Sequence, residues 1–185
     1  MKKAILLSAV LAIFLWSCAL IPHRVRPIDW PENITYMAAL CELDMSWKGM
    51  KYSGSMALVI NYPSTLQIEI YGPFGETLLV VKKEGDDFLL ATRGEQFTDP
   101  RFFEDRFGIK LDDFMDDLAM MSKRDRIGGG NGLVERGSYR VIYRFDDGRD
   151  SLCWEGKDGS ICVAFVEVTF EKKDFLEKGN NGNAG

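Results

Sequence analysis

The chain has 185 residues and is acidic overall, with 28 Asp and Glu, 23 Lys and Arg and a formal net charge of −5. This length suits one domain with a real hydrophobic core and leaves little room for a second. Because the chain has no basic stripe that could neutralise phosphates, its composition argues against nucleic-acid binding and gives no electrostatic attraction to anionic lipid surfaces.

The N-terminal segment follows the pattern of an export signal. Two lysines near the start form a short positive region, and the uncharged run 4–15 is too short to span a bilayer comfortably. Cys18 follows a small residue, an arrangement that resembles the cleavage site of bacterial lipoproteins, in which the cysteine becomes the acylated first residue. We therefore expect 1–17 to be a lipoprotein signal peptide and Cys18 to be lipidated. The alternative is that Cys18 is an ordinary residue of the apolar run.

The rest of the chain divides into a tether, one domain and a tail. Residues 18–30 contain two prolines and the only histidine, His23, and are expected to form a lipidated tether. The domain is expected to span 31–175. Residues 176–185 are predicted to be a disordered tail, because the Gly- and Asn-rich end is too polar to fold.

The start of the domain has a helical pattern. Pro31 is typical of a first helical turn, and Ile34, Met37, Ala38 and Cys41 recur at helical spacing. We predict an amphipathic helix here, with Cys41 as a buried small apolar side chain rather than a reactive thiol.

From Met45 the apolar period changes to two. Alternating apolar residues before and after the Pro63–Ser64 turn predict paired antiparallel strands, and the segments 77–83 and 88–92 predict two more. We expect a meander of four or five strands. Its turns fall at Gly72–Gly75 and at Glu84–Asp86.

Two helices are predicted next. Asp99 and Pro100 are typical of a helix start, and Gly108 is placed to end that helix. A second helix has apolar residues at 3.6-residue spacing, namely Leu111, Phe114, Met115, Leu118 and Met121. Its other face has Asp112, Asp113, Asp116 and Asp117. We expect these carboxylates to form a solvated face, since they lack the loop geometry and glycine that a Ca²⁺ site requires.

The C-terminal third returns to strands. Gly128–Gly132 is expected to be a flexible loop, because it lacks the lysine and hydroxyl residue that complete a phosphate loop. Alternation from Tyr139 to Phe145 predicts a strand, and two more strands follow to about Phe170.

Two cysteines lie in the last predicted hairpin. A turn over the four residues Gly156–Gly159 places Cys153 opposite Cys162, and a disulfide can then form in an oxidising compartment. A two-residue Asp158–Gly159 turn instead leaves the two cysteines out of register. Both alternatives stay open.

Short antiparallel connections and the order strands, helices, strands predict an α+β domain built on a curved antiparallel sheet. The amphipathic helices are available to cover its concave face as a lid. Strand segments such as 78–81 are apolar on both faces, which suggests an apolar cavity between sheet and helices.

The chain shows no catalytic machinery. Its single histidine lies in the tether, and no Cys or His pair has the spacing of a zinc site, so we expect no enzyme, no metal and no cofactor. Phe74 stands out because it lies at a turn tip between Pro73 and Gly75, where small polar residues are usual. Either Phe74 folds back onto the sheet edge, or it is an apolar finger that touches a membrane or an acyl chain.

The run 66–78, Leu-Gln-Ile-Glu-Ile-Tyr-Gly-Pro-Phe-Gly-Glu-Thr-Leu, follows a lipidated start and lies between a predicted strand and its partner. It resembles the corresponding segment of the LolB family, outer-membrane lipoproteins that receive other lipoproteins from the periplasmic carrier LolA. The stretches 94–97, 99–108 and 111–121 are also similar in order and character to the two lid helices of that family. The resemblance covers most of the chain from Ile34 to Phe170.

The resemblance implies an incomplete antiparallel β-barrel with lid helices over an apolar cavity. It implies that Phe74, with Pro73 and Gly75, protrudes to assist transfer into the bilayer. The residues that it places in the acyl cavity are Leu58, Ile60, Leu66, Ile68, Ile70, Phe114 and Leu118.

The function implied by the resemblance is the acceptance of acylated lipoproteins from a LolA-like carrier and their insertion into the outer membrane. The protein is then a monomer, lipid-anchored through Cys18 and facing the periplasm. The competing hypothesis is a non-catalytic structural subunit of an envelope complex. An envelope hydrolase is the weakest hypothesis, because no nucleophile with a positioned base can be named.

Overall fold

The computed structural model describes residues 28–31, 33–119, 131–145 and 149–171. In these ranges the first six strands are β1 Tyr36–Trp47, β2 Met50–Asn61, β3 Thr65–Tyr71, β4 Thr77–Glu84, β5 Asp87–Thr92 and β6 Gln96–Phe97. Two helices follow, α2 Arg101–Phe107 and α3 Leu111–Leu118. The last four strands are β7 Gly132–Arg136, β8 Tyr139–Arg144, β9 Ser151–Gly156 and β10 Gly159–Thr169.

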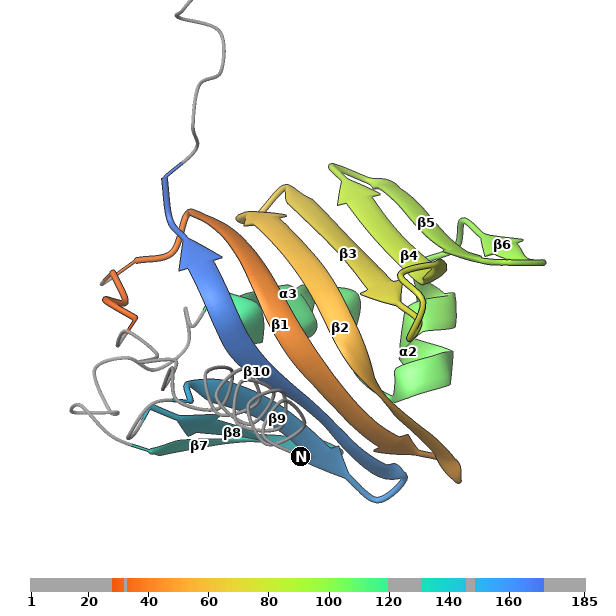
Figure 1. The fold of residues 1–185 in the computed structure, drawn as a ribbon. Coiled ribbons are helices and arrows are strands. Elements are labelled where there is room, and N and C mark those ends of the chain that lie inside the picture. The colour runs from red at the N-terminus through yellow and green to blue at the C-terminus, as the bar shows by residue number, and fades with distance from the viewer. Residues whose placement is uncertain (1–27, 32, 120–130, 146–148, 172–185) are drawn as a thin grey trace, which may run out of the picture.

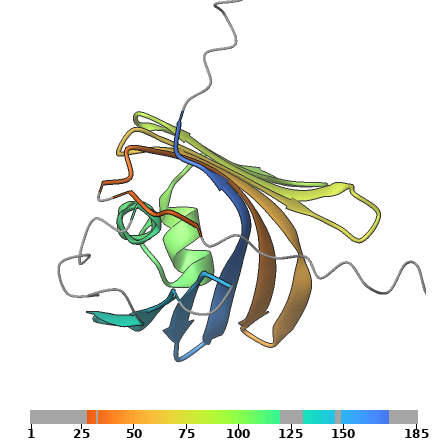
Figure 2. The same cartoon turned by 60° about the vertical axis from the view of Figure 1, so that its left-hand side comes forward.

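The strands form one antiparallel sheet of ten strands in the order β6-β5-β4-β3-β2-β1-β10-β9-β8-β7 (Figure 1). The sheet is strongly curved but does not close, since β6 and β7 remain its two edges. The chain passes from one edge to the other through α2 and α3, which lie inside the curve (Figure 2). The curved antiparallel sheet and the incomplete barrel predicted above are therefore confirmed.

Alternation along the strands places the core on the concave face. In β2 the side chains of Met56, Leu58 and Ile60 are buried, and they pair in register with the β3 residues 70, 68 and 66. α2 and α3 cover this face with phenylalanines and aliphatic residues, including the buried Phe103 and Phe114. The core is thus a single layer between the sheet and the two helices.

The helix predicted at the start of the domain is wrong: this segment is strand β1. Its buried side chains are Met37, Ala39, Cys41 and Leu43, which alternate with a period of two. The helical spacing was a coincidence, because the convex face of β1 also has apolar residues at 38 and 40 and these mask the alternation. Pairing with β2 on one side and β10 on the other then overrides local propensity. Cys41 is a free, buried cysteine, as expected for a small apolar side chain.

The two predicted helices are confirmed. Asp99 Oδ1 accepts the backbone N–H of Arg101 at 2.9 Å at the start of α2. Gly108 ends this helix with a φ of 65°, a left-handed conformation that favours glycine. The apolar residues of α3 from Leu111 to Leu118 are buried, and Met121 lies outside the described residues.

The strand β7 was missed by sequence analysis. Gly132 belongs to this strand rather than to a glycine loop, and Gly128–Gly130 lie outside the described residues. Only Val134 of β7 is buried, so the strand has no apolar alternation to detect.

The β9-β10 hairpin settles the pairing of the cysteines. Gly156 pairs with Gly159, which is the four-residue turn, and Cys153 pairs with Cys162 at a Cα–Cα distance of 4.1 Å. A disulfide joins the two cysteines.

The packed region begins earlier than expected. Ile28 and Trp30, which we placed in the tether, pack against the core. The Trp30 ring lies 5.0 Å from that of Phe165, and its Nε1 donates to Asp150 Oδ2 at 2.6 Å. The two nearby prolines suggested a separate tether. The buried surface of the Trp30 ring instead fixes this segment to the core.

Several sequence predictions fall outside the described residues. They are the signal peptide 1–17, the lipidated Cys18, His23 in the tether and the tail 176–185. Within the part of the chain that the structure describes, no helix is long and apolar enough to cross a membrane.

Candidate functional site

An apolar pocket lies between the concave face of the sheet and the helices. Only apolar side chains line it, and they come from β1 to β4, from β10 and from both helices. They are Leu43, Met45, Met56, Ile68, Ile70, Leu79, Val81, Phe103, Phe107, Ile109, Phe114, Ile161 and Val163. The pocket has the chemistry of a site for hydrocarbon, because it offers no hydrogen-bonding group to a polar ligand.

The pocket is small in this conformation, with a free volume of about 50 Å³. Pockets that enclose a drug-sized ligand usually have about 300–1,000 Å³. A long acyl chain therefore needs the helices or their side chains to move away from the sheet.

The expected cavity residues divide into two groups. Ile68, Ile70 and Phe114 line the pocket. The others, Leu58, Ile60, Leu66 and Leu118, are fully buried in the core beside it and do not line it. The pocket thus lies nearer to the β3-β4 turn than the predicted set implied.

Two larger pockets lie beside α2, one shared with the β4-β5 turn and the start of α3 and one shared with β6, and they differ in chemistry. One of about 360 Å³ and one of about 830 Å³ are lined largely by charged and polar side chains, such as Lys83, Arg101 and Glu104. Their lining does not suit hydrocarbon. The small apolar pocket is therefore the better candidate site for an acyl chain.

Among the residues that the structure describes, Phe74 is the most exposed large apolar residue, at 93%. It lies at the tip of the β3-β4 turn and does not fold back onto the sheet edge. Gly75 N–H donates to the Gly72 carbonyl at 3.0 Å, and the φ of Gly75 is 80°. The turn connects β3 and β4, and on these strands Ile70 and Leu79 both line the apolar pocket.

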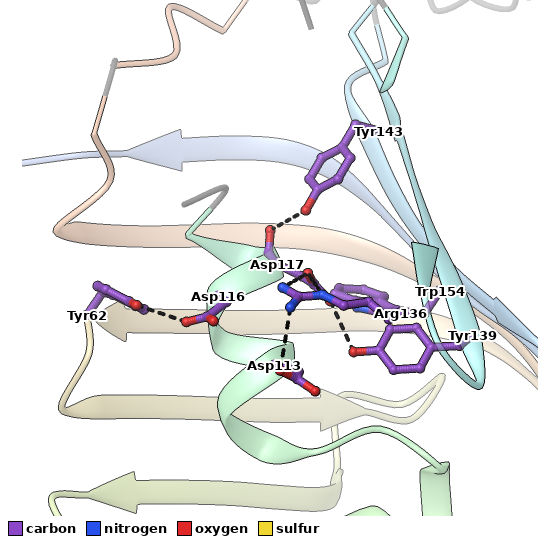
Figure 3. Close-up of polar contacts among 8 residues, drawn as sticks. All are labelled: Tyr62, Asp113, Asp116, Asp117, Arg136, Tyr139, Tyr143 and Trp154. Carbon is purple, nitrogen blue, oxygen red and sulfur yellow. Dashed lines mark hydrogen bonds and ion pairs between the residues drawn. The ribbon is translucent and has the colours of Figure 1, made fainter. Parts of the chain in front are cut away.

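α3 is attached to the β7-β9 wall by a buried carboxylate (Figure 3). Asp117 is 0% exposed, and its Oδ1 accepts from Arg136 Nη2 at 2.7 Å and Nε at 3.1 Å. Its Oδ2 accepts from Trp154 Nε1 at 3.1 Å and from the Tyr139 hydroxyl at 3.4 Å. The Tyr143 hydroxyl donates to the Asp117 carbonyl at 3.2 Å.

The expectation of a uniformly solvated acidic face is therefore wrong at Asp117. Asp112 is exposed, but Asp117 lies at the rim of the apolar face, three residues after Phe114, and is enclosed by β7, β8 and β9. Burial raises the pKa of the Asp117 carboxyl group, and the Arg136 guanidinium opposes this rise. The rim position was visible in the sequence, whereas the partners on three later strands were not.

The opposite side of α3 is also attached to the sheet. Tyr62 directly follows β2, and its hydroxyl donates to Asp116 Oδ1 at 2.8 Å (Figure 3). On the side of Asp117, Arg136 Nη1 also lies 3.5 Å from Asp113 Oδ1. Neighbouring carboxylates of one helix thus hold opposite walls of the curved sheet.

α2 is attached differently. Its Phe103 and Phe107 rings point into the apolar pocket, and Phe103 packs against Phe114 with 5.4 Å between ring centroids. Two side chains from the β1-β2 end donate to its last carbonyls: Trp47 Nε1 to Arg106 O at 3.2 Å and Lys48 Nζ to Asp105 O at 3.1 Å. Between residues that the structure describes, no α2 side chain forms an ion pair with a strand.

Within the described ranges, no group of His, Cys, Asp and Glu side chains is arranged to hold a metal ion. No protein-family model matches the sequence, and no curated protein matches it. A function for this chain therefore has to be inferred from its own residues and their arrangement.

Proposed function

We propose that this protein is a LolB-like acceptor of acylated lipoproteins. It takes a lipoprotein from a LolA-like periplasmic carrier, holds the acyl chains against the concave face of its sheet, and inserts them into the outer membrane. Its own lipidated Cys18 anchors it to that membrane on the periplasmic side. It acts as a monomer and as a carrier rather than an enzyme.

The observation that carries this proposal is the position of Phe74. A phenylalanine with 93% of its surface in water is unfavourable unless it has an apolar partner. The strands that leave its turn contribute Ile70 and Leu79 to the lining of the apolar pocket. An acyl chain that leaves the pocket at this end of the sheet therefore passes next to Phe74.

Entry of the acyl chain requires one part of the helical cover to separate from the sheet. α2 is the favourable part, because Phe103 and Phe107 hold it through apolar contacts that a lipid chain can replace at little net free energy. α3 stays in place, because separating it would leave the buried Asp117 and its donors unpaired. In this proposal α2 is the mobile lid and α3 is a fixed support.

No cofactor or nucleotide is needed for this function. Transfer proceeds downhill if the acyl chains bind this protein more tightly than the carrier and the bilayer more tightly than this protein. The near balance between protein and lipid contacts keeps each step reversible.

The test is a transfer assay with the full-length lipidated protein reconstituted in phosphatidylcholine vesicles. A fluorescent triacylated lipopeptide on a LolA-type carrier serves as cargo, and its insertion is followed by quenching from labelled lipids. Phe74→Glu is expected to fold normally and to lose insertion, because a carboxylate at the tip opposes entry into hydrocarbon. Normal insertion by this variant overturns the role assigned to Phe74.

The matched control is Leu133→Glu. Leu133 is also exposed, at 57%, but it lies on the edge strand β7 rather than at the β3-β4 turn. This variant is expected to insert cargo at the wild-type rate. Equal loss in both variants would indicate a general charge effect and not a role of the turn.

The small size of the pocket favours a second candidate, a non-catalytic structural subunit of an envelope complex. In that case the pocket of about 50 Å³ is a packing defect, and Phe74 contacts a protein. Copurification of a stoichiometric partner, with no bound lipid in mass spectra of the isolated protein, would favour this second candidate.

A further inference from the structure

The turn that presents Phe74 brings polar atoms with it. If the Phe74 ring enters the bilayer, the backbone of residues 72–76 comes close to the hydrocarbon and loses part of its hydration. Backbone N–H groups that lose water without another acceptor are unfavourable in lipid. An inserting turn is therefore expected to contain acceptors for its own N–H groups.

Glu76 supplies these acceptors. Its carboxylate Oε2 accepts the Phe74 N–H at 3.1 Å, and its carbonyl accepts the Gly72 N–H at 2.8 Å. The Gly75 N–H donates to Gly72 at 3.0 Å. The three N–H groups at 72, 74 and 75 are thus all satisfied inside the turn, and the remaining residue of the tip, Pro73, has none to satisfy.

The fit of the Glu76 side chain is specific to this turn. A Cβ on Gly72 would lie 2.5 Å from the Glu76 carboxyl carbon, so a side chain at position 72 would displace the carboxylate from its place over this glycine. The Glu76 side chain is 31% exposed, although it is a charged residue beside a loop tip. The carboxylate is therefore folded back under the tip rather than extended into water.

The charge of this carboxylate is balanced from the neighbouring strand. Arg93, directly after β5, places Nη2 at 3.5 Å from Glu76 Oε1. On the other side, burial and then the charge of Glu76 raise the pKa of the Tyr52 hydroxyl. The turn thus presents an apolar ring above a compensated ion pair.

We propose that Glu76 is the positioning residue of the Phe74 turn and that, with Arg93, it makes the turn competent to enter a bilayer. This inference rests on the proposed function, because it assigns Glu76 a role in the same insertion step. It has a counterintuitive consequence. A carboxylate near an inserting ring ordinarily opposes insertion, so its removal ought to help; here, removal of Glu76 reduces insertion.

The experiment measures how deeply position 74 lies in the membrane. The full-length lipidated protein with Phe74→Trp is reconstituted in phosphatidylcholine vesicles that contain doxyl-labelled phosphatidylcholine, and quenching of the introduced tryptophan is recorded. The same protein without this substitution supplies the background of the native tryptophans. Glu76→Ala and Glu76→Gln are then each added to Phe74→Trp.

Glu76→Ala is expected to reduce the quenching at position 74 by about fivefold, the effect of leaving one N–H without its acceptor. Glu76→Gln is expected to give a smaller loss, because the amide oxygen still accepts the Phe74 N–H while the charge partner of Arg93 is gone. The thermal unfolding midpoint is expected to stay unchanged in both variants. If Glu76 only stabilised the fold, its replacement would lower this midpoint.

The matched control is Glu155→Ala. Glu155 also forms an ion pair, with Arg140, and its side chain is 30% exposed, close to that of Glu76, but it lies on β9 far along the sheet from the turn.

Quenching that is unchanged or stronger in Glu76→Ala overturns the inference. If the introduced tryptophan is not quenched even with Glu76 present, the proposed function fails and the inference fails with it. Strong quenching that survives Glu76→Ala refutes the inference alone.

Discussion

The two helices inside the curved sheet are held by opposite kinds of contact. α3 is fixed by a buried carboxylate, Asp117, which accepts from side chains of β7, β8 and β9, and by Asp116, which accepts from Tyr62. α2 is held through Phe103 and Phe107 and through single bonds to its last carbonyls. Yet the two helices are separated only by Gly108–Lys110.

In the proposed function, this difference lets one short segment combine a fixed and a mobile part. Hydrogen bonds to a buried charge are directional and leave a large penalty if they are broken, so α3 has one stable position. Apolar contacts are not directional, and another apolar surface can replace them. In the proposed function, lipid is that other surface, and α2 is the element that it displaces.

The largest expected effect is that of Asp117→Ala. This change removes the acceptor of the buried Trp154 N–H and leaves the Arg136 guanidinium with the Asp113 carboxylate at 3.5 Å. We expect the free energy of unfolding to fall by about 3–5 kcal/mol, measured by urea denaturation. The exposed side of the same helix supplies the control, because Asp112→Ala is expected to cost less than about 1 kcal/mol.

If Asp117→Ala does not fold, Tyr62→Phe tests how firmly α3 is fixed on the side opposite Asp117. It removes the single bond to Asp116 and is expected to cost about 0.5–1.5 kcal/mol. Asp117→Ala with the same small loss as Asp112→Ala would show that α3 is no better fixed than α2.

A smaller effect is expected in the hydrogen exchange of the unmodified protein. Amides of α2 should exchange about tenfold faster than those of α3, since fewer buried contacts must break when α2 opens. Exchange followed by mass spectrometry on the full-length chain measures this ratio. Equal protection of the two helices, or stronger protection of α2, would contradict its role as the mobile lid.

The smallest effect is the pH dependence that Asp117 contributes. Burial raises the pKa of this carboxyl group in the folded state, so the folded protein binds the proton more strongly than the unfolded chain does. Stability from Asp117 is therefore full below its unfolded pKa and is lost as the pH rises through the folded pKa.

The measurement is the difference in unfolding free energy between the wild-type protein and Asp117→Asn at a series of pH values. This difference is expected to fall as the pH rises through the acid range and then to become constant. A difference that rises with pH would mean that the Arg136 charge outweighs burial at this site.

Patterns with a short period could be read from the sequence. The strands β2 to β5, the two helices, the β3-β4 turn with Phe74 and the final strands follow from alternation, helical spacing and turn residues within a few positions of one another. The pattern was misleading in β1, whose convex face is also partly apolar, and silent in β7, which buries only Val134. In both segments, partners elsewhere in the sheet decide the structure.

The candidate site could be predicted only in part, for the same reason. Phe74, Ile68, Ile70 and Phe114 were identified from their local pattern. The partners of Asp117 and the pairing of Glu76 with Arg93 were not. Those contacts join residues 17 to 37 positions apart, and no local signal marks one such residue as the partner of another.

Local sequence patterns were therefore enough to predict the antiparallel sheet, the two amphipathic helices between its two sets of strands, and the aromatic residue at a tight turn. These depend on the spacing of apolar residues and on backbone preferences, which act over a few residues. Three features became known from the three-dimensional arrangement: Asp117 is buried, Cys153 faces Cys162, and Glu76 folds under Phe74. The burial of Asp117 depends on which strands lie beside α3, the pairing of the cysteines on the register of the β9-β10 hairpin, and the position of Glu76 on the packing of its side chain within the turn. The spacing of apolar residues fixes none of the three.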